Sequence, residues 1–297
     1  MTTTRSIVEN SMSIAEFTTT IDGLNIHYCH AGDTGPVVVL LHGGGIDSAR
    51  LSWELLIPEL AHTHRVFAPD FPGYGESDKP ADLPYTLEYL AAFAIEFLDV
   101  LRIERCSLVG ISMGGAVAMS VALDQPERVE KLVLVDSYGL QRKVPLGKLG
   151  YLSVHVPGMQ RFTSAMMRSR AAIKYSLGVL LKKPGALTEE LVDLAHAEAM
   201  RPGAGIAFSA FQRSEVTWNG TRSVLLDRLS EIQAPTLLVH GTKDTAVPAE
   251  SSREAQRAIA GARLAWLEGA GHWPQRDDPK AFNRVVTDFL RDRRMDA

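Results

Sequence analysis

Short runs of β-branched and other apolar residues recur along this chain and constrain its fold more than any other feature. These runs are nearly continuous in apolar character, and they cover residues 37–42, 64–70, 106–112, 131–137, 236–242 and 262–268. Strands that are buried on both faces of a parallel sheet have this character. Helical patterns lie between the runs, for example over residues 87–103. Strands that alternate with helices predict an α/β fold built on a parallel sheet.

The limits of this alternation set the expected domain boundaries. Residues 17–32 alternate between apolar and polar character and contain Asp22-Gly23, which predicts a tight turn between two antiparallel edge strands. From residue 140 to residue 229 the pattern is helical and broken at Pro-Gly pairs, and a buried strand follows at Thr236. We therefore expect a flexible N-terminus over residues 1–16, a core over residues 17–139 and 230–297, and a helical cap inserted over residues 140–229.

Composition bounds the class of protein. The 297 residues include 45% hydrophobic and 22% charged residues, and the net charge is −4. The two cysteines, Cys29 and Cys106, lie in apolar runs, which predicts buried thiols in a reducing compartment. No apolar run is long enough to cross a membrane or to serve as a secretion signal. We expect a cytoplasmic protein that acts on a small molecule, binds no nucleic acid, has little reason to contact a membrane and could form a homodimer.

One segment departs from the overall charge balance. Residues 140–183 contain nine lysine or arginine residues and no aspartate or glutamate. A block of this kind attracts anions to one region of a molecule. A solvated helical face explains the pattern most simply. An anionic substrate, or contact with an anionic membrane or a partner, are the alternatives.

A single serine, Ser112, stands between Gly110 and Gly114, where an apolar run ends and a helical pattern begins. A tight strand-to-helix turn strains the serine backbone, and the glycines remove side chains that would clash in it. The N-terminus of the helix also aims free N–H groups at whatever bonds to the serine oxygen. The pattern predicts a nucleophile elbow, and a turn with an incidental serine is the alternative.

A serine hydroxyl needs a base to take its proton and a carboxylate to orient that base. His272 lies in a glycine-rich loop directly after the last predicted strand, and Asp244 follows the strand before it. Asp136 also ends a strand and competes with Asp244 for the role of the acid. We predict a triad of Ser112, Asp244 and His272, in that chain order.

The negative oxygen that forms during attack on a carbonyl needs rigid N–H donors. The sequence His42-Gly43-Gly44-Gly45 follows a predicted strand, and the absence of side chains there lets the backbone approach a substrate. The N–H of Met113, directly after the serine, supplies a second donor. We expect an oxyanion hole at this loop, with His42 fixing the loop.

Several motifs taken together resemble the α/β-hydrolase superfamily: HGGG at 42–45, DFPGYGES at 70–77, GISMGG at 110–115, HGTKDTAVP at 240–248 and GHWPQ at 271–275. The resemblance implies the α/β-hydrolase fold, with a mostly parallel eight-stranded sheet, helices on both faces and a helical cap. It also implies the triad Ser112, Asp244 and His272, oxyanion amides at Gly44 and Met113, and no cofactor or metal. Gly43 and Trp273 are the expected substrate contacts.

Within the superfamily, the chain is similar to the branch that hydrolyses carbon–carbon bonds in ring-cleavage products, which are carboxylates. The similarity lies in Ser112–Gly115, Gly271–Gln275 and Phe282–Leu290. The chain departs from that branch at Ile46-Asp47, Ile111 and Ala195, where the branch has Pro-Gly, asparagine and arginine. We therefore predict a carboxylesterase-like serine hydrolase that cleaves a small ester through an acyl-enzyme. Hydrolysis of a carbon–carbon bond is the alternative, followed by a monoacylglycerol lipase and a non-catalytic receptor.

Overall fold

The computed structural model describes residues 13–142, 147–156, 158–159 and 168–292. Within these residues, eight strands form one sheet in the order β1-β2-β4-β3-β5-β6-β9-β10. They are β1 (Ala15–Ile21), β2 (Leu24–Ala31), β3 (Val37–Leu41), β4 (Arg65–Pro69), β5 (Cys106–Ile111), β6 (Val129–Val135), β9 (Thr236–Gly241) and β10 (Arg263–Leu267). Strand β2 is antiparallel to β1 and β4, and the other neighbouring pairs are parallel. The predicted eight-stranded, mostly parallel sheet is confirmed.

The predicted hairpin forms the edge of this sheet. Asp22 and Gly23 join β1 to β2 with φ values of 48° and 79°, as a two-residue hairpin turn requires. Strand β1 begins at Ala15, inside the segment expected to be a flexible N-terminus, because Ala15 and Glu16 pair with His30 and Cys29. Residues 1–12 of that segment lie outside the described residues.

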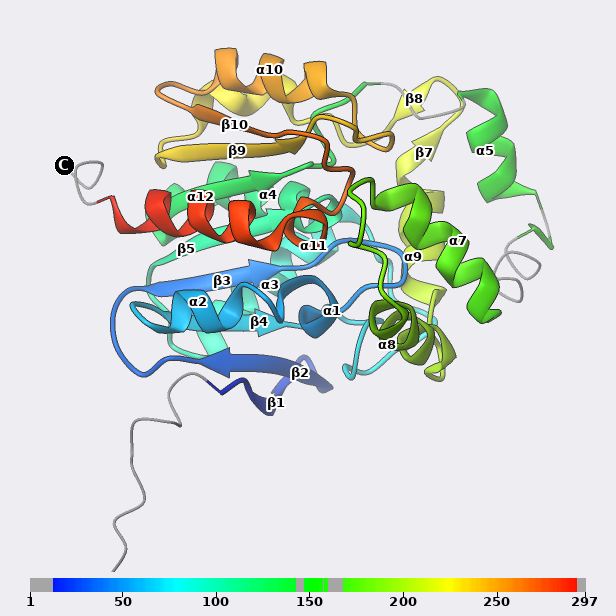
Figure 1. Cartoon of the computed structure of the whole chain (residues 1–297), viewed down its shortest axis with the longest axis horizontal. Coiled ribbons are helices and arrows are strands. Elements are labelled where there is room, and N and C mark those ends of the chain that lie inside the picture. Colours follow the sequence, from blue (N-terminus) through cyan, green and yellow to red (C-terminus); the bar gives the residue numbers. More distant parts are fainter. Residues whose placement is uncertain (1–12, 143–146, 157, 160–167, 293–297) are drawn as a thin grey trace, which may run out of the picture.

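Helices cover both faces of the sheet (Figure 1). One face packs against α3 (Leu87–Val100), α4 (Met113–Asp124) and α10 (Ala249–Ala258). The other packs against α1 (Ala49–Trp53), α2 (Ile57–Ala61) and α12 (Pro279–Arg291). Both cysteines are free and buried between these layers, and burial raises the pKa of each thiol to about 12.

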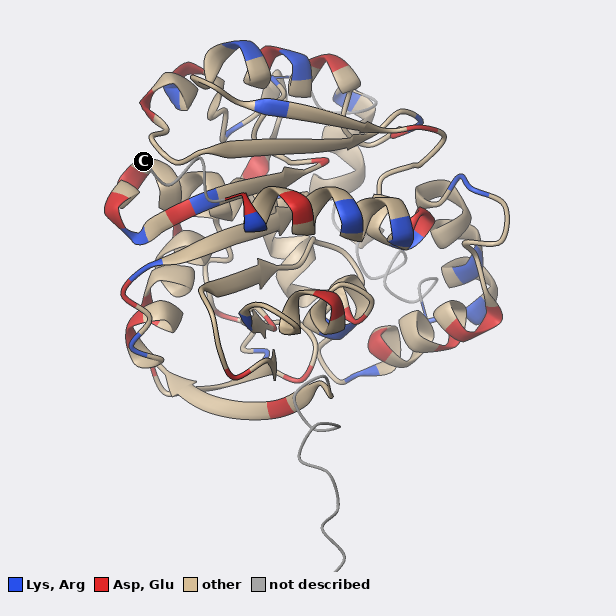
Figure 2. Ribbon diagram, turned by 60° about the vertical axis from the view of Figure 1, so that its left-hand side comes forward, with Lys and Arg blue, Asp and Glu red and all other residues tan. Residues whose placement is uncertain are grey.

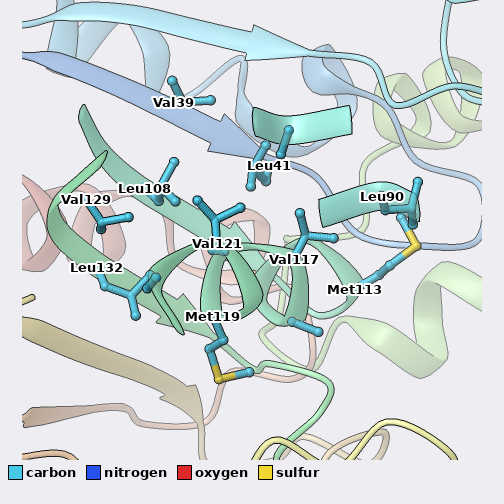
Figure 3. Close-up of a cluster of buried hydrophobic side chains, with 14 of the residues drawn as sticks. Val39, Leu41, Leu90, Leu108, Met113, Val117, Met119, Val121, Val129 and Leu132 are labelled. Carbon is cyan, nitrogen blue, oxygen red and sulfur yellow. The ribbon is translucent and has the colours of Figure 1, made fainter. Parts of the chain in front are cut away.

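Helix α4 is buried along most of its length, which is typical of a helix that is apolar on every side. Its residues Val117 and Val121 pack with Leu108 of β5 and Leu132 of β6 (Figure 3). This packing fixes the direction in which α4 leaves the end of β5, and therefore the position of the turn between them.

Between β6 and β9 the chain leaves the sheet, and residues 140–229 are called the insertion. Its described helices are α5 (Lys148–His155), α7 (Arg170–Leu180), α8 (Glu189–Met200) and α9 (Ile206–Glu215), followed by the 3-10 helix η3 (Leu226–Glu231). Helices α5, α7, α8 and α9 lie beyond the end of the sheet toward which the parallel strands point (Figure 1), whereas η3 packs against α10 and α4. The insertion also contains an antiparallel pair, β7 (Val216–Thr217) and β8 (Gly220–Thr221), where we expected only helices. Strands of two residues are too short to show a periodic pattern.

Carboxylates neutralise much of the basic segment within the insertion. Arg170 bonds to Glu189 and Asp193 at 2.7 Å each, and Lys174 also contacts Glu189. Positive and negative positions interleave across the ribbon (Figure 2). Lys143 and Arg161 of this segment lie outside the described residues. These ion pairs are consistent with the prediction that the basic segment forms a solvated helical face. None of the described helices is long and apolar enough to cross a membrane.

The packing around α4 predicts which leucine matters for stability. Leu132→Ala should lower the free energy of unfolding by about 2–5 kcal/mol, because it removes a fully buried side chain and leaves a cavity. Leu149→Ala is the matched control: Leu149 is 69% exposed, and its loss should change that free energy by less than about 0.5 kcal/mol. Urea denaturation measures both values. Equal effects would contradict this account of the core.

Candidate active site

Ser112 occupies the turn between β5 and α4 with φ 51° and ψ −117°. A non-glycine residue at positive φ is strained, at a cost of about 1–3 kcal/mol. A Cβ atom on Gly110 would lie closer than 3.0 Å to the backbone of Gly114 across the turn, and one on Gly114 would lie equally close to the backbone at the end of β3. The strain persists because Ser112 N donates to Val135 O at 2.9 Å and its carbonyl accepts from Ala116 N at 3.1 Å. The two glycines therefore provide the steric clearance that the sequence suggested.

The structure places His272 and Asp244 in direct contact. His272 Nδ1 lies 2.8 Å from Asp244 Oδ2, and Asp244 Oδ1 accepts from Ala246 N at 2.7 Å. A carboxylate can only accept, so the proton on Nδ1 faces Asp244 and Nε2 is left as the basic nitrogen. His272 and Ser112 both line one cavity. The three residues predicted as a triad thus gather at the carboxyl ends of β5, β9 and β10.

Opposing effects act on the charge of Asp244. Burial alone would raise its pKa, but the hydrogen bond and charge of His272 and the N–H of Ala246 outweigh burial and lower the pKa below its ordinary value. Asp244 is therefore an anion that can stabilise a positive charge on His272.

Asp136 contacts Asp244 rather than the imidazole of the predicted triad. It is fully buried at the end of β6, where its Oδ1 accepts from Gly241 N at 3.1 Å. Burial, reinforced by the negative charge of Asp244 and a hydrogen bond to it, raises the pKa of Asp136 well above its ordinary value. Asp136 is therefore a neutral acid that can donate its proton to Asp244.

His240 lies beside this acid without supplying a positive charge. Its Nδ1 is 3.2 Å from Asp136 Oδ1, but its Nε2 donates to Val247 O at 3.2 Å and its Nδ1 accepts from Ser252 Oγ at 2.8 Å. Burial lowers the pKa of His240. The neutral imidazole leaves Asp136 without a cationic partner, which explains why that acid keeps its proton.

The glycine loop after β3 is held by two side chains. Phe71 N donates to His42 Nε2 at 3.1 Å, so the proton on Nδ1 faces Gly43 O at 2.7 Å. Gly43 N donates to Asp47 Oδ2 at 2.8 Å, and the departure from the Pro-Gly pattern at Asp47 therefore supplies an anchor for the loop. Among the described residues, no acceptor engages the N–H of Gly44 or Met113. Both N–H groups are thus available to an oxygen of a substrate.

The cavity next to Ser112 has a volume of about 370 Å³ and is mostly apolar. Gly43 and Trp273, the expected substrate contacts, both line it, as do Ile46 and Ala195. None of its described lining residues is lysine or arginine. Five polar residues of its wall were not predicted from the sequence: Tyr138, Gln141, Ser176, Gln212 and Glu215.

The loop that carries His272 is tied to the insertion. His272 N donates to Leu180 O at 2.9 Å, at the end of α7. Asp277, in the short helix α11 (Pro274–Asp277), accepts from Lys182 N and Lys183 N at 2.9 Å and from Gly271 N at 2.5 Å. These bonds join the insertion and the histidine loop into one hydrogen-bonded unit.

Comparison with known proteins agrees with this architecture. A family model described as the alpha/beta hydrolase fold matches residues 36–279. The chain therefore belongs to the alpha/beta hydrolase fold family, and its class is that of a hydrolase.

The relatives that it resembles act on particular compounds. The chain is 32% identical over 263 residues to a 2-hydroxymuconate semialdehyde hydrolase of a Pseudomonas species, covering 88% of this chain and 89% of the relative. It is 31% identical over 271 residues to a 2-hydroxy-6-oxo-2,4-heptadienoate hydrolase of Pseudomonas putida, covering 90% and 92%. The solved structure of a 2-hydroxy-6-oxo-6-phenylhexa-2,4-dienoate hydrolase from a Rhodococcus species superposes with a TM-score of 0.79 at 26% identity, covering 94% and 99%. These relatives favour the carbon–carbon alternative over the ester prediction.

The two aspartates should differ in their effect on the reactivity of Ser112. Asp244→Asn should slow labelling of Ser112 by a fluorophosphonate about 10³–10⁴-fold, because an amide N–H facing His272 favours the wrong tautomer. Asp136→Asn, the matched control, should slow it less than about tenfold, since its amide can still donate to Asp244. Mass spectrometry follows the labelling. The reverse order would make Asp136 the triad acid.

Asp136→Asn should also change how stability depends on pH. The folded protein holds a proton on Asp136 that the unfolded chain releases above about pH 4. Its contribution is complete below that pH and is lost as pH rises toward the raised pKa, by about 1.4 kcal/mol per pH unit. Asparagine does not titrate, so the variant should gain stability relative to the parent protein as pH rises. Urea denaturation at several pH values measures this difference, and parallel curves would contradict it.

Proposed function

We propose that this protein is a serine hydrolase in which Ser112 is the nucleophile, His272 the base and Asp244 the acid that orients the base. The strained turn at Ser112, the 2.8 Å contact between His272 and Asp244, and the cavity shared by Ser112 and His272 support these roles. The N–H groups of Gly44 and Met113 are the proposed oxyanion donors.

The proposed reaction has two steps. Ser112 Oγ attacks a carbonyl carbon while its proton moves to His272 Nε2, and the negative oxygen accepts from Gly44 and Met113. The bond to the leaving group then breaks, the leaving group takes the proton from His272, and an acyl group remains on Ser112. Water attacks this ester, His272 takes a proton from the water, and the proton returns to Ser112 as the acid product leaves.

The bond that we propose is the carbon–carbon bond next to a ketone in a ring-cleavage product. The single observation that carries this choice is the 31–32% identity to hydrolases named for such compounds, extending over about nine-tenths of both chains. When a carbon–carbon bond is cleaved, the electron pair of the broken bond passes into the conjugated system of the leaving fragment. The dienol form must first become a ketone, so that the fragment can accept that pair.

Ester hydrolysis is the second candidate, and one observation favours it. The ring-cleavage compounds are carboxylates, and a carboxylate buried in an apolar cavity needs a cationic or hydrogen-bonding partner. The described wall of the cavity contains no lysine or arginine, and alanine stands at Ala195. A small uncharged ester does not need such a partner.

A direct comparison of substrates tests the proposal. The ratio kcat/KM should be higher for a 2-hydroxy-6-oxo-dienoate than for p-nitrophenyl butyrate, and Ser112→Ala should lower both by at least about 10⁴-fold. A preference of more than about tenfold for the ester would select the second candidate. If Ser112→Ala kept nearly the turnover of the parent protein, the assignment of Ser112 as the nucleophile would be wrong.

A further inference from the structure

The cavity beside Ser112 contains a carboxylate in its wall. Glu215, the last residue of α9, is 1% exposed and lines the cavity. Its Oε1 accepts from Ser223 Oγ at 3.0 Å, and its Oε2 accepts from Ser223 N and Tyr138 Oη at 3.1 Å each. Arg222 lies 3.7 Å from Oε1 but also bonds to Glu88 at 2.9 Å, so two carboxylates share its charge. Glu215 is thus fixed in place and only partly neutralised.

The hydrogen bond between Tyr138 and Glu215 makes the tyrosine hydroxyl an acceptor toward other groups. A carboxylate cannot donate, so the hydroxyl proton of Tyr138 points to Glu215. Toward any other group Oη can therefore only accept, and the Thr221 side chain already acts on it as a donor. Burial, and then the negative charge of Glu215, raise the pKa of Tyr138 above its ordinary value, so this proton stays in place.

Gln141 adds an acceptor with no partner. The residue is 8% exposed and lines the same cavity, and its buried Oε1 has no hydrogen-bond partner in the described part of the chain. Its backbone carbonyl accepts from Thr221 Oγ1 at 2.9 Å, and Thr221 pairs with Val216, the residue after Glu215. A buried acceptor left unpaired is unfavourable, and a donor on a bound molecule would satisfy it.

We infer that Tyr138, Gln141 and Glu215 form a binding subsite for a hydroxyl group on the substrate, and that this subsite rejects a carboxylate. The name acceptor wall is used for these three residues. A hydroxyl donates to Gln141 Oε1 without adding charge. A carboxylate offers no donor and would meet the negative charge of Glu215 in an apolar surrounding, where screening by water is weak.

The inference rests on the proposed serine hydrolysis, but it holds whichever bond is cleaved. If the substrate is a ring-cleavage carboxylate, its carboxylate lies away from the acceptor wall. The part of the substrate at the wall then carries the hydroxyl.

Phosphonate probes with an uncharged reacting group test the inference without a choice between the two bonds. An ethyl p-nitrophenyl alkylphosphonate reacts with Ser112: the Oγ–P bond forms, p-nitrophenolate leaves, and His272 takes the serine proton. Three probes share one alkyl chain, which ends in a methyl group, a hydroxyl group or a carboxylate. Chains of several lengths are used. At the length that reaches the wall, the hydroxyl probe should react at least about threefold faster than the methyl probe, and the carboxylate probe at least about tenfold slower.

Substitutions at Gln141 and Glu215 test whether these residues cause the differences in rate between the probes. Gln141→Leu should bring the hydroxyl-to-methyl ratio close to one, because leucine has a similar size and no acceptor. Glu215→Gln should raise the carboxylate-to-methyl ratio about tenfold by removing the negative charge. Glu198→Gln is the matched control, since Glu198 of α8 pairs with Arg201 at 2.9 Å and is not among the described residues that line this cavity. Its ratios should equal those of the parent protein.

The outcomes distinguish a failure of the acceptor wall from a failure of the serine mechanism. Reaction of all three probes at the same rate at every length, or unchanged ratios in both Gln141→Leu and Glu215→Gln, would overturn the acceptor wall and leave the serine mechanism standing. Failure of every probe to react with Ser112 would overturn the serine mechanism and, with it, the inference.

Discussion

The turn between β5 and α4 is the constraint on which the rest of the site depends. Ser112 has a positive φ there, a conformation that an isolated chain avoids. Its amide bonds to Val135 of β6, and α4 is buried on every side, so the core supplies the energy that keeps the turn strained. The neighbouring glycines let the backbone of α4 approach the ends of β3 and β5. The large apolar core and the position of the Ser112 hydroxyl are thus parts of one arrangement.

The surroundings of Asp136 and Asp244 determine which of these two buried carboxyl groups carries a negative charge. Asp136 and Asp244 lie together in the interior, and two adjacent carboxylates cannot both ionise there at low cost. One proton on Asp136 resolves this conflict and gives Asp244 an additional donor, so the negative charge stays on the acid that contacts His272. Burial lowers the pKa of His240, so its imidazole stays neutral and does not disturb this distribution.

Most of the fold could be predicted because its signals are local. Buried parallel strands appear as continuous apolar runs, and the turn at Asp22-Gly23 is specified by its own two residues. The contact between His272 and Asp244 could be expected because each residue lies in the loop after a predicted strand, in a motif order that has a known chemical reason. In contrast, β7 and β8 could not be predicted, since two residues per strand leave no period.

The wall of the cavity could not be predicted for a different reason. Glu215 and Tyr138 are 77 positions apart and meet only when the insertion folds over the sheet. The basic segment was ambiguous because the partners of Arg170 and Lys174 lie on α8, beyond the segment itself. The prediction of an ester substrate rested on three departures from the carbon–carbon branch, at Ile46-Asp47, Ile111 and Ala195. The relatives favour the alternative instead.

The bonds between the histidine loop and the end of α7 have a consequence for access to the cavity. The carbonyl of Leu180 accepts from the backbone N–H of His272. Asp277 accepts from Gly271 and from Lys182 and Lys183, which lie shortly after the end of α7. Residues of α7 also line the cavity. A displacement of α7 that widened the entrance would pull on the imidazole as well. In the proposed mechanism, a shift of α7 that admits a molecule would therefore also disturb the alignment of the base.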